Sequence, residues 1–426
     1  MKDNSAWLFL EPYVHMLCQD GVFLLYNTIS KTVLEFSNSH ALIEITEGLI
    51  DPGNGYVVSL STSQLQDATV RDFIRQLKEH FMGDLLDPSW SDGKPVNIYP
   101  EPFVKFGLKL PQEKHSAMKA DLDVRNYLQE ITLFLNTGTE ASAEPYSAAY
   151  LQCSYPAVVS AKTEEMDIHL FRTVIDDVNN YTPTLIHISG INLLAYPYLE
   201  DVLEVLGSSP FQKKYHLLIE HWEERIIPYI LVQKQTTLSL YINFPVNHDT
   251  IAGYLRSLPD PKLIKKLEFN FVVSNQEDLE EALEIVKLFD LNNVFFKPFF
   301  TGKNLDFFRE NVFVSKEEIL ASQPDQQQVF SRISINENDF GKFSVLPGGE
   351  VYANLNDPMI GEATKSSLVQ LVRSELGKGI SWRRIRAQVS PCKDCLYQFL
   401  CPPISSYEIF MKRFNFCDVY PNGEEV

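Results

Sequence analysis

Between residues 130 and 300 the sequence alternates short apolar segments with segments of helical periodicity. Helical stretches such as 166–181 and 277–290 separate several runs of strand length that are rich in apolar and β-branched residues. Strands that alternate with helices form βαβ units, in which the strands are parallel. The sequence therefore predicts an α/β fold with a parallel sheet, either open or closed into a partial barrel. The expected strands are 130–136, 184–190, 216–222, 237–244, 266–274 and 293–300.

The N-terminal part of the chain has a different pattern. Residues 7–36 contain short apolar runs separated by the turn-forming letters EP, QDG and NTISK, which is typical of a small antiparallel meander. Ser39 is placed to cap a helix that the DPGNG cluster ends. Three strands with two or three helices predict a winged-helix unit. The second long helix carries an apolar stripe at Val70, Phe73, Ile74, Leu77 and Phe81.

Two further changes of pattern divide the chain. Residues 87–112 are rich in proline and are expected to form a linker or the irregular start of the next domain. Residues 344–358 predict a hairpin with a Gly-Gly turn, and residues 367–390 predict a helix, a break and a second helix. The basic run WRRIRAQ at 382–388 is expected to be a solvated helix face. The predicted domains are 1–95, 96–330 and 331–426.

Four of the six cysteines lie in the last thirty-five residues with the spacing C-x2-C-x5-C-x15-C. Two thiolates three residues apart can bind one metal centre from a single turn, and two later thiolates can complete the coordination. Such a set suits tetrahedral zinc or a 4Fe-4S cluster. Cysteines that are simply buried as small apolar residues are the alternative. The four residues are Cys392, Cys395, Cys401 and Cys417.

The net charge of −19 argues against nucleic acid as a partner, because affinity for it comes mainly from Lys and Arg that neutralise phosphates. The sequence shows no signal-peptide pattern at its start and no apolar run of membrane-spanning length. We therefore expect a cytoplasmic protein without a membrane partner. In that compartment clustered cysteines more often hold metal than form disulfides.

The string PCKDCLYQFLCPPISSYE, which follows a Gly-containing hairpin, resembles the C-terminal SPASM domain of radical S-adenosylmethionine peptide-modifying enzymes. The resemblance implies that the four cysteines hold one 4Fe-4S cluster, the second auxiliary cluster of that family. Ser405 and Asn354 stand at two positions where the family has cysteines of its first auxiliary cluster. Serine and asparagine are poor substitutes for thiolates at iron, so the first auxiliary cluster is expected to be absent.

The resemblance also implies a radical-SAM-like partial barrel in the middle domain. After the first barrel strand the family carries C-x3-C-x2-C, whereas residues 136–156 contain Cys153 alone. The second strand of the family ends in G-G-E-P, whereas this chain has Ser189, Gly190, Ile191 and Asn192. No catalytic residues and no bound S-adenosylmethionine are therefore expected. The chain resembles pseudo-radical-SAM proteins of Bacteroidales (GG-type) peptide natural-product systems.

Peptide-modifying enzymes of this kind often carry a winged-helix element that binds the leader of a precursor peptide, and the N-terminal unit resembles it. The leader would add a strand to an exposed sheet edge and lay apolar side chains in a strand–helix groove. This groove is expected between 31–36 and the helix bearing Phe73, Leu77 and Phe81. The alternative is that these residues only form the core of the unit. The candidate peptide-binding residues are Thr32, Val33, Leu34, Phe36, Phe73 and Leu77.

Together these features predict an α/β protein with an N-terminal winged-helix peptide-recognition-like unit, a degenerate partial (β/α) radical-SAM-like barrel and a C-terminal SPASM-like Fe-S domain. The expected function is that of a non-catalytic accessory protein in the maturation of ribosomal peptides. Its expected partners are a precursor leader and a catalytically complete radical SAM maturase. One alternative is an enzyme that uses the barrel for a different reaction, with the cluster as electron relay. Another is a zinc-stabilised protein-interaction module.

Overall fold

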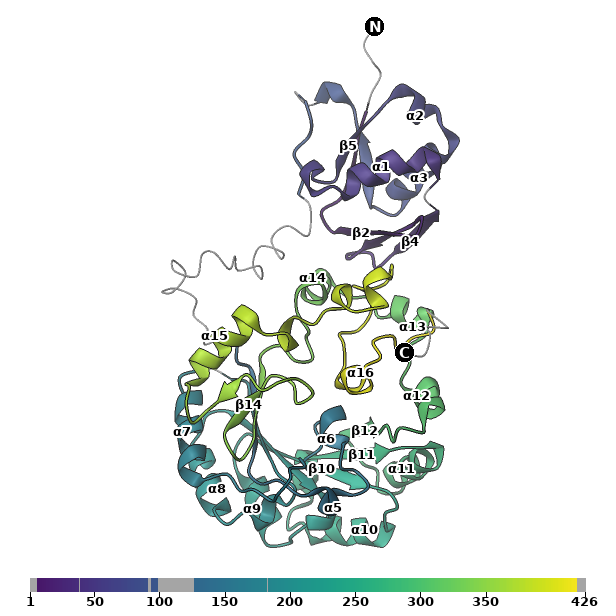
Figure 1. The fold of residues 1–426 in the computed structure, drawn as a ribbon. Coiled ribbons are helices and arrows are strands. Elements are labelled where there is room, and N and C mark those ends of the chain that lie inside the picture. Colours follow the sequence, from purple (N-terminus) through teal and green to yellow (C-terminus); the bar gives the residue numbers. More distant parts are fainter. Residues whose placement is uncertain (1–5, 38, 91–92, 99–125, 182, 420–426) are drawn as a thin grey trace.

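The computed structural model describes residues 6–37, 39–90, 93–98, 126–181 and 183–419. Figure 1 shows a smaller N-terminal unit above a larger ring of helices and strands formed by the rest of the chain. Most of the linker expected at 87–112 lies outside the described residues. In the described part of the chain, no helix combines the length and the apolar composition that a membrane span requires.

The N-terminal unit consists of two antiparallel sheets, with strand orders β5-β1-β6 and β2-β3-β4, and of three α-helices. Its elements are β1 (Ala6–Leu10), β2 (Val14–Gln19), β3 (Val22–Asn27), β4 (Val33–Ser37), α1 (His40–Ile50), β5 (Val57–Leu60), α2 (Thr62–Gln66), α3 (Ala68–Glu79) and β6 (Gly83–Leu86). The predicted mixture of short strands and helices is confirmed. The single meander expected for 7–36 is wrong, because β1 leaves it and pairs with β5 and β6 instead.

Local sequence explains the ends of several elements of this unit. Asp20 and Gly21 have φ of 49° and 74° and join β2 to β3 in a two-residue turn, as their residue types favour. Oδ1 of Asp67 accepts hydrogen bonds from the backbone N–H groups of residues 69 and 70 and so caps α3. Ser39 occupies the N-cap position of α1, but its hydroxyl forms no hydrogen bond to the described residues.

A nine-stranded sheet forms the middle of the molecule, with strand order β12-β11-β10-β9-β8-β7-β13-β14-β15. Its first six strands in the chain are all parallel. Five helices lie along its outer side in Figure 1: α7 (Ile168–Val178), α8 (Leu199–Gly207), α9 (Ile226–Val232), α10 (His248–Ser257) and α11 (Gln276–Leu288). Ile131, Leu133 and Ile188 pack with Phe171 and Val174 in its apolar core. The predicted parallel sheet is confirmed as an open, partial barrel. The strands are β7 (Glu130–Phe134), β8 (Leu185–Ser189), β9 (Gln212–Leu218), β10 (Thr236–Asn243), β11 (Leu267–Val273) and β12 (Val294–Pro298).

One strand is shifted relative to the sequence prediction. The strand expected at 216–222 begins four residues earlier, and residues 219–221 form a 3-10 turn instead. The first residues of β9 are QKK, and because they are polar, a search for apolar runs did not predict them as part of a strand. The side chain of Lys213 is nevertheless buried, because its Nζ donates to the backbone oxygens of Leu206 and Ser209 at 3.1 and 3.3 Å.

The C-terminal part continues the same sheet. The predicted hairpin at 344–358 is confirmed by β13 (Lys342–Val345) and β14 (Glu350–Tyr352), which are antiparallel, and β13 lies parallel to β7. The boundary expected between residues 330 and 331 falls inside α14 (Gln326–Ser334). The remaining elements are β15 (Gly361–Glu362), α5 (Glu140–Ala143), α6 (Ala149–Gln152), α12 (Leu305–Asn311), α13 (Lys316–Ala321), α15 (Leu368–Lys378) and α16 (Ser406–Met411).

The second helix expected within 367–390 is absent from the described structure. The chain forms only 3-10 turns at 381–383 and 386–388 after α15 ends. Oε1 of Glu375 on α15 accepts a hydrogen bond from the backbone N–H of Trp382, whose ring is buried against Phe343. This anchored aromatic residue fixes the turn, and a regular helix does not continue through it.

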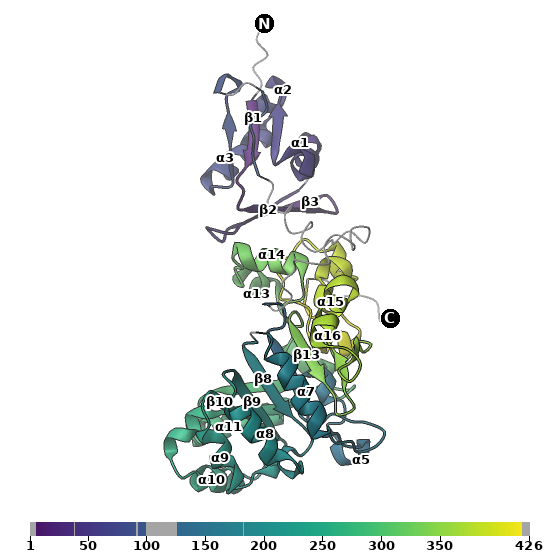
Figure 2. The ribbon, with the colours of Figure 1, turned by 90° about the vertical axis from the view of Figure 1, so that its left-hand side faces the viewer.

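The N-terminal unit and the C-terminal segment share a buried contact. One face of the sheet β2-β3-β4 supplies Leu24 and Tyr26, which pack with Val329 of α14 and with Tyr397 and Leu400. The hydroxyl of Tyr26 also donates to the backbone oxygen of residue 324 at 2.7 Å. Figures 1 and 2 both show this sheet lying directly against α13 and α14.

Candidate metal centre

The four C-terminal cysteines line one small cavity of about 10 Å³. Cys392, Cys395 and Cys401 are each 6% exposed and come from a single loop that begins with a 3-10 turn at 392–394. Cys417 comes from a separate segment, which pairs with the chain at Val314 through a β-bridge. The structure therefore brings together four thiols that the sequence separates by up to twenty-five positions.

Burial favours the neutral thiol at Cys392, Cys395 and Cys401 when no metal is bound. Desolvation raises the pKa of Cys395 to about 11 and that of Cys401 to about 12, and it also raises the pKa of Cys392. Metal ions and clusters bind the thiolate, so loading the cavity would release protons. The guanidinium of Arg386 opposes the shift at Cys392, because a nearby cation favours the thiolate.

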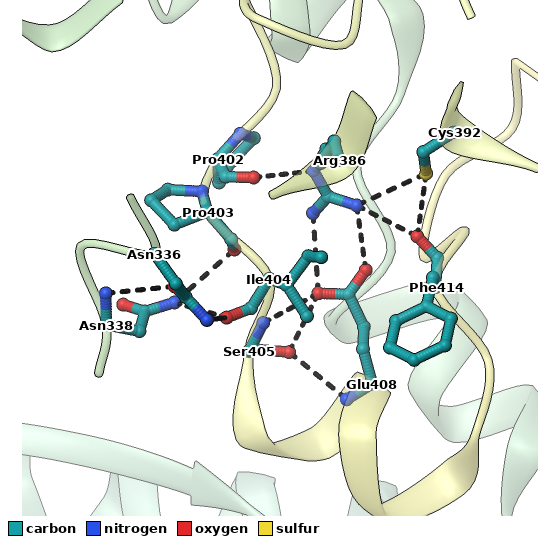
Figure 3. A network of polar contacts seen from close by, with 10 residues as sticks. All are labelled: Asn336, Asn338, Arg386, Cys392, Pro402, Pro403, Ile404, Ser405, Glu408 and Phe414. Atoms are coloured by element: carbon teal, nitrogen blue, oxygen red, sulfur yellow. Dashed lines mark hydrogen bonds and ion pairs between the residues drawn. The ribbon is translucent and has the colours of Figure 1, made fainter. Parts of the chain in front are cut away.

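Arg386 and Glu408 form a buried ion pair beside this cavity (Figure 3). Nη1 of Arg386 lies 2.9 Å from Oε1 of Glu408 and 3.5 Å from Sγ of Cys392. The same guanidinium donates to the backbone oxygens of Phe414 at 2.8 Å and Pro402 at 2.6 Å. The expectation that WRRIRAQ is a solvated helix face is therefore wrong for Arg386, which is 9% exposed. Its partner lies twenty-two residues away in the sequence and could not be found by local pattern.

Ser405 and Asn354, which stand at two family cysteine positions, both have structural roles. Ser405 caps α16: its Oγ accepts from the N–H of Glu408, and its own N–H donates to Oε2 of that residue. Nδ2 of Asn354 donates to Oδ1 of Asp339 at 2.9 Å, and Nδ2 of Asn336 donates to Oδ2 of the same carboxyl group. Ser405 is thus hydrogen-bonded to Glu408, and Asn354 is hydrogen-bonded to Asp339.

The donor set at the four-cysteine cavity fits a thiolate-bound group. It offers four soft sulfur ligands and a neighbouring guanidinium that would offset negative charge. Within the ranges that the structure describes, no three His, Cys, Asp or Glu side chains are arranged to hold a single metal ion. Metal binding by the four cysteines is thus a prediction from their chemistry and spacing.

The barrel loop that follows β7 holds a single thiol. Cys153 lies just after α6, and its Sγ donates to the backbone oxygen of Ala149 at 3.5 Å. Burial raises its pKa to about 11.

The turn after β8 is held by hydrogen bonds within the protein. Oδ1 of Asn136 accepts from the backbone N–H of Asn192, and Nδ2 of Asn136 donates to the backbone oxygen of Asn192. A side chain at Gly190 would overlap Asn136, which explains the glycine at this close approach.

The inner face of the barrel is polar, a feature that the sequence analysis missed. His187 bonds through Nδ1 to Nε2 of His216 at 2.8 Å and lies 3.5 Å from Oε2 of Glu130, while His216 bonds to the hydroxyl of Tyr241 at 3.3 Å. These residues come from four adjacent strands, and three of them line a cavity of about 200 Å³. The signal was present in strings such as EITLF and LIHIS, where polar residues alternate with apolar ones.

Burial and contacts with neighbouring groups set the protonation of these hydrogen-bonded side chains. Burial, together with the neighbouring His187, Lys214 and Lys297, lowers the pKa of His216 well below its ordinary value. The hydrogen bond from His187 lowers the pKa of Glu130. Burial also raises the pKa of Tyr241, so its hydroxyl is protonated at neutral pH. The hydrogen-bonded set therefore includes the ionised carboxylate of Glu130, the neutral ring of His216 and the phenol of Tyr241.

The candidate peptide-binding residues divide into two groups. Phe73 and Leu77 are 1% and 0% exposed and belong to the apolar core of the N-terminal unit, so the core alternative holds for both side chains. The ring of Phe36 packs at 5.2 Å from that of Phe73 and partly covers it. Thr32, Val33 and Leu34 are half-buried in or just before β4. The expectation that Phe81 belongs to the helical stripe is wrong, because α3 ends at Glu79 and the side chain of Phe81 is 73% exposed.

β4 is an edge strand, since it pairs with β3 on one side and with no other described strand. Its residue Glu35 accepts a hydrogen bond from the hydroxyl of Tyr397 at 2.8 Å and lies 3.1 Å from Nζ of Lys316. The backbone N–H of Tyr397 in turn donates to Sγ of Cys395 at 3.4 Å. The edge strand and the four-cysteine cavity are thus only a few contacts apart.

No family model and no curated protein matches this chain. Among solved structures, SuiB of Streptococcus suis bound to its precursor peptide SuiA is 10% identical, with 96% of this chain and 98% of that chain covered and a TM-score of 0.48. SuiB bound to S-adenosylmethionine has the same identity and coverage, with a TM-score of 0.40. BtrN in complex with AdoMet and 2-DOIA is 12% identical, with 63% of this chain and 93% of that chain covered and a TM-score of 0.29.

Proposed function

We propose that this chain is a non-catalytic accessory protein in the maturation of ribosomally made peptides, which binds a precursor leader and holds one 4Fe-4S cluster. The observation that carries the proposal is the contrast between two places. Four cysteines from two segments line one cavity near the C-terminus, whereas the loop after β7 contains Cys153 alone. One thiolate cannot hold the three-ligand cluster on which reductive cleavage of S-adenosylmethionine depends.

Cys392, Cys395, Cys401 and Cys417 would hold the cluster. When bound, a 4Fe-4S cluster supplies either structural cross-linking or one-electron transfer. Arg386 would offset part of the negative charge of the bound thiolates, and Glu408 holds that guanidinium in place. Zinc is the alternative occupant, because the same four ligands suit it.

The leader would bind as an added strand along β4. This strand has a free edge among the described residues, and hydrogen bonds to its main chain would supply affinity. The half-buried side chains of Thr32, Val33 and Leu34 lie on or beside this strand and would contact the leader directly. Phe73 and Leu77 would not contact the leader and would contribute to its binding only through the core against which Phe36 packs.

The second proposed partner is a catalytically complete radical SAM maturase, to which this chain would present the bound precursor in the cytoplasm. We further infer that the system is of the Bacteroidales GG type. Co-purification with a radical SAM protein encoded beside this gene tests the partnership. Recovery of that maturase alone, at equal expression of both proteins, would contradict it.

The cluster is tested by anaerobic reconstitution of the full chain with iron and sulfide. We expect about four irons per chain and a brown protein, with loss of both in Cys401→Ser and retention in Cys153→Ser. A colourless protein that retains one zinc would support the zinc alternative. About eight irons per chain, or reductive cleavage of S-adenosylmethionine, would contradict the non-catalytic role.

Leader binding is tested by hydrogen–deuterium exchange of the full chain with synthetic leaders of precursors encoded beside this gene. We expect slower exchange at the amides of β4 than at those of β2, the other edge of the same sheet. A scrambled leader provides the control. Protection confined to other elements would place the leader elsewhere and would leave the cluster result unaffected.

The polar barrel interior favours a second candidate function, an enzyme that performs a reaction without S-adenosylmethionine. Glu130 and His187 line the cavity of about 200 Å³ and could accept or donate a proton there. His187→Gln should then abolish turnover while the fold is retained. Unchanged activity of the assembled maturation system with that variant would exclude this role.

A further inference from the structure

A second cavity, of about 890 Å³, lies where the last three parallel strands end. Residues that directly follow β10, β11 and β12 line it, together with the loop before α6 and one residue of α16. Figure 1 shows α16 and α6 near each other at this side of the ring. In parallel α/β sheets the carboxyl ends of strands are the usual place for ligands.

One wall of this cavity is aromatic and well anchored. The ring of Tyr146 lies 5.2 Å from that of Phe299, and its hydroxyl donates to the backbone oxygen of Phe244 at 3.2 Å. Phe300 rests against Phe308 with ring centroids 5.5 Å apart. The aromatic residues that line the cavity are Tyr146, Phe244, Phe299, Phe300 and Phe410.

Three acidic residues line the cavity as well. Glu277, Asp278 and Glu281 all project from the first two turns of α11. Asp278 already has hydrogen-bond partners within the protein. Its Oδ2 accepts from the backbone N–H and the hydroxyl of Ser274 at 2.8 and 2.7 Å. Glu277 is exposed, and Glu281 is half-buried at 3.4 Å from Nε2 of His248. No lysine or arginine is among the described residues that line this cavity.

We propose that this cavity binds a Lys or Arg side chain of a peptide segment. Aromatic rings attract a cation through their negative faces, and the carboxylates that line the same cavity attract it by charge. An anionic side chain would meet the same carboxylates unpaired, and an apolar side chain would gain nothing from them. The inference goes beyond leader binding, because this cavity lies in the barrel and not in the N-terminal unit.

The test uses the full chain and three capped pentapeptides of glycine whose central residue is lysine, norleucine or glutamate. Saturation-transfer NMR measures their affinities at low and high salt. We expect the lysine peptide to bind at least about fivefold more tightly than the other two, with an advantage that salt reduces. Equal affinity of the lysine and norleucine peptides would overturn the proposal.

Substitutions then assign the binding to this cavity. Glu277→Gln combined with Glu281→Gln should weaken the lysine peptide about fivefold or more, and Phe410→Leu should weaken it as well. Glu280→Gln combined with Glu284→Gln removes the same two charges from α11 outside the cavity and should leave affinity unchanged. Equal weakening by this control variant would show that only the general negative field attracts the peptide. Variants of the barrel do not alter β4, so failure here is distinguishable from failure of leader binding.

Discussion

The hydroxyl of Tyr397 donates a hydrogen bond to Oε1 of Glu35 at 2.8 Å, and these residues are 362 positions apart. Glu35 lies on the edge strand β4, whereas Tyr397 lies between Cys395 and Cys401 in the cysteine loop. Nζ of Lys316 lies 3.1 Å from the same carboxylate and 5.1 Å from the centre of the Tyr397 ring. The strand proposed to receive the leader is therefore fixed to the loop proposed to hold the cluster.

The first prediction concerns this contact. Tyr397→Phe removes one hydrogen bond to a charged acceptor, and we expect a loss of about 1–2 kcal/mol in the free energy of unfolding. Urea denaturation of the full chain measures it. Tyr229→Phe, at a side chain that is 57% exposed, is the matched control and should change little. Identical midpoints for Tyr397→Phe and the unaltered chain would show that the contact adds no stability.

The second prediction concerns the buried pair of Arg386 and Glu408. Arg386→Met leaves a carboxylate that is 3% exposed without its cation, which should cost about 3–5 kcal/mol of unfolding free energy. Adding Glu408→Gln should recover much of this loss, because Gln still accepts from the N–H of Ser405 as a helix cap. Denaturant titration of the three proteins measures the coupling.

A control for the second prediction exists on the protein surface. Arg75 bonds Asp72 and Glu79 on the exposed face of α3, where water screens the charges. Arg75→Met should therefore have little measurable effect on unfolding. If the double variant at Arg386 and Glu408 were no more stable than Arg386→Met alone, the loss would come from packing and not from the unpaired charge.

The third prediction is a pH effect at the contact between the N-terminal unit and α14. His15 is 1% exposed, packs on Phe330 and Phe399, and has a pKa that burial lowers from 6.5 to about 4. The unfolded chain therefore binds a proton more readily. Stability from neutral His15 is fully present above about pH 6.5 and is lost as pH falls toward 4, by roughly 2 kcal/mol at pH 5.

His15→Leu tests this effect, because leucine cannot take up a proton. Unfolding free energies at pH 7 and pH 5 should differ less in this variant than in the unaltered chain. The difference between the two proteins isolates His15 from other groups that titrate in the same range. A pH dependence that the substitution leaves unaltered would contradict the prediction.

The fourth prediction has the opposite sign. Burial raises the pKa of Asp339 from 3.8 to about 7, so the folded chain binds this proton more tightly than the unfolded chain. Stability from protonated Asp339 is fully present below about pH 4 and is lost as pH rises toward 7, by a few kcal/mol. Asp339→Asn should flatten this component, as measured by urea unfolding between these pH values. An unchanged slope would mean that Asp339 remains ionised in the folded chain.

Local patterns in the sequence determined much of this protein. The alternation of strands and helices between 130 and 300, the stripe at Val70 to Leu77 and the Gly-Gly hairpin were all predictable, because hydrophobic period and turn residues act over a few positions. The spacing of the four cysteines and the single Cys153 are likewise properties of the sequence alone. The start of β9 was misplaced, because Lys213 is buried by backbone oxygens that no local pattern reveals.

Only the tertiary structure decided which residues meet. It buried Arg386 against Glu408, placed Phe73 and Leu77 in the core, and joined Glu35 to Tyr397. Each of these outcomes depends on a partner far away in the chain, and whether burying a charged or apolar group is favourable depends on that partner. The sequence by itself thus specified the elements and the set of ligands, while packing decided which side chains are free to bind.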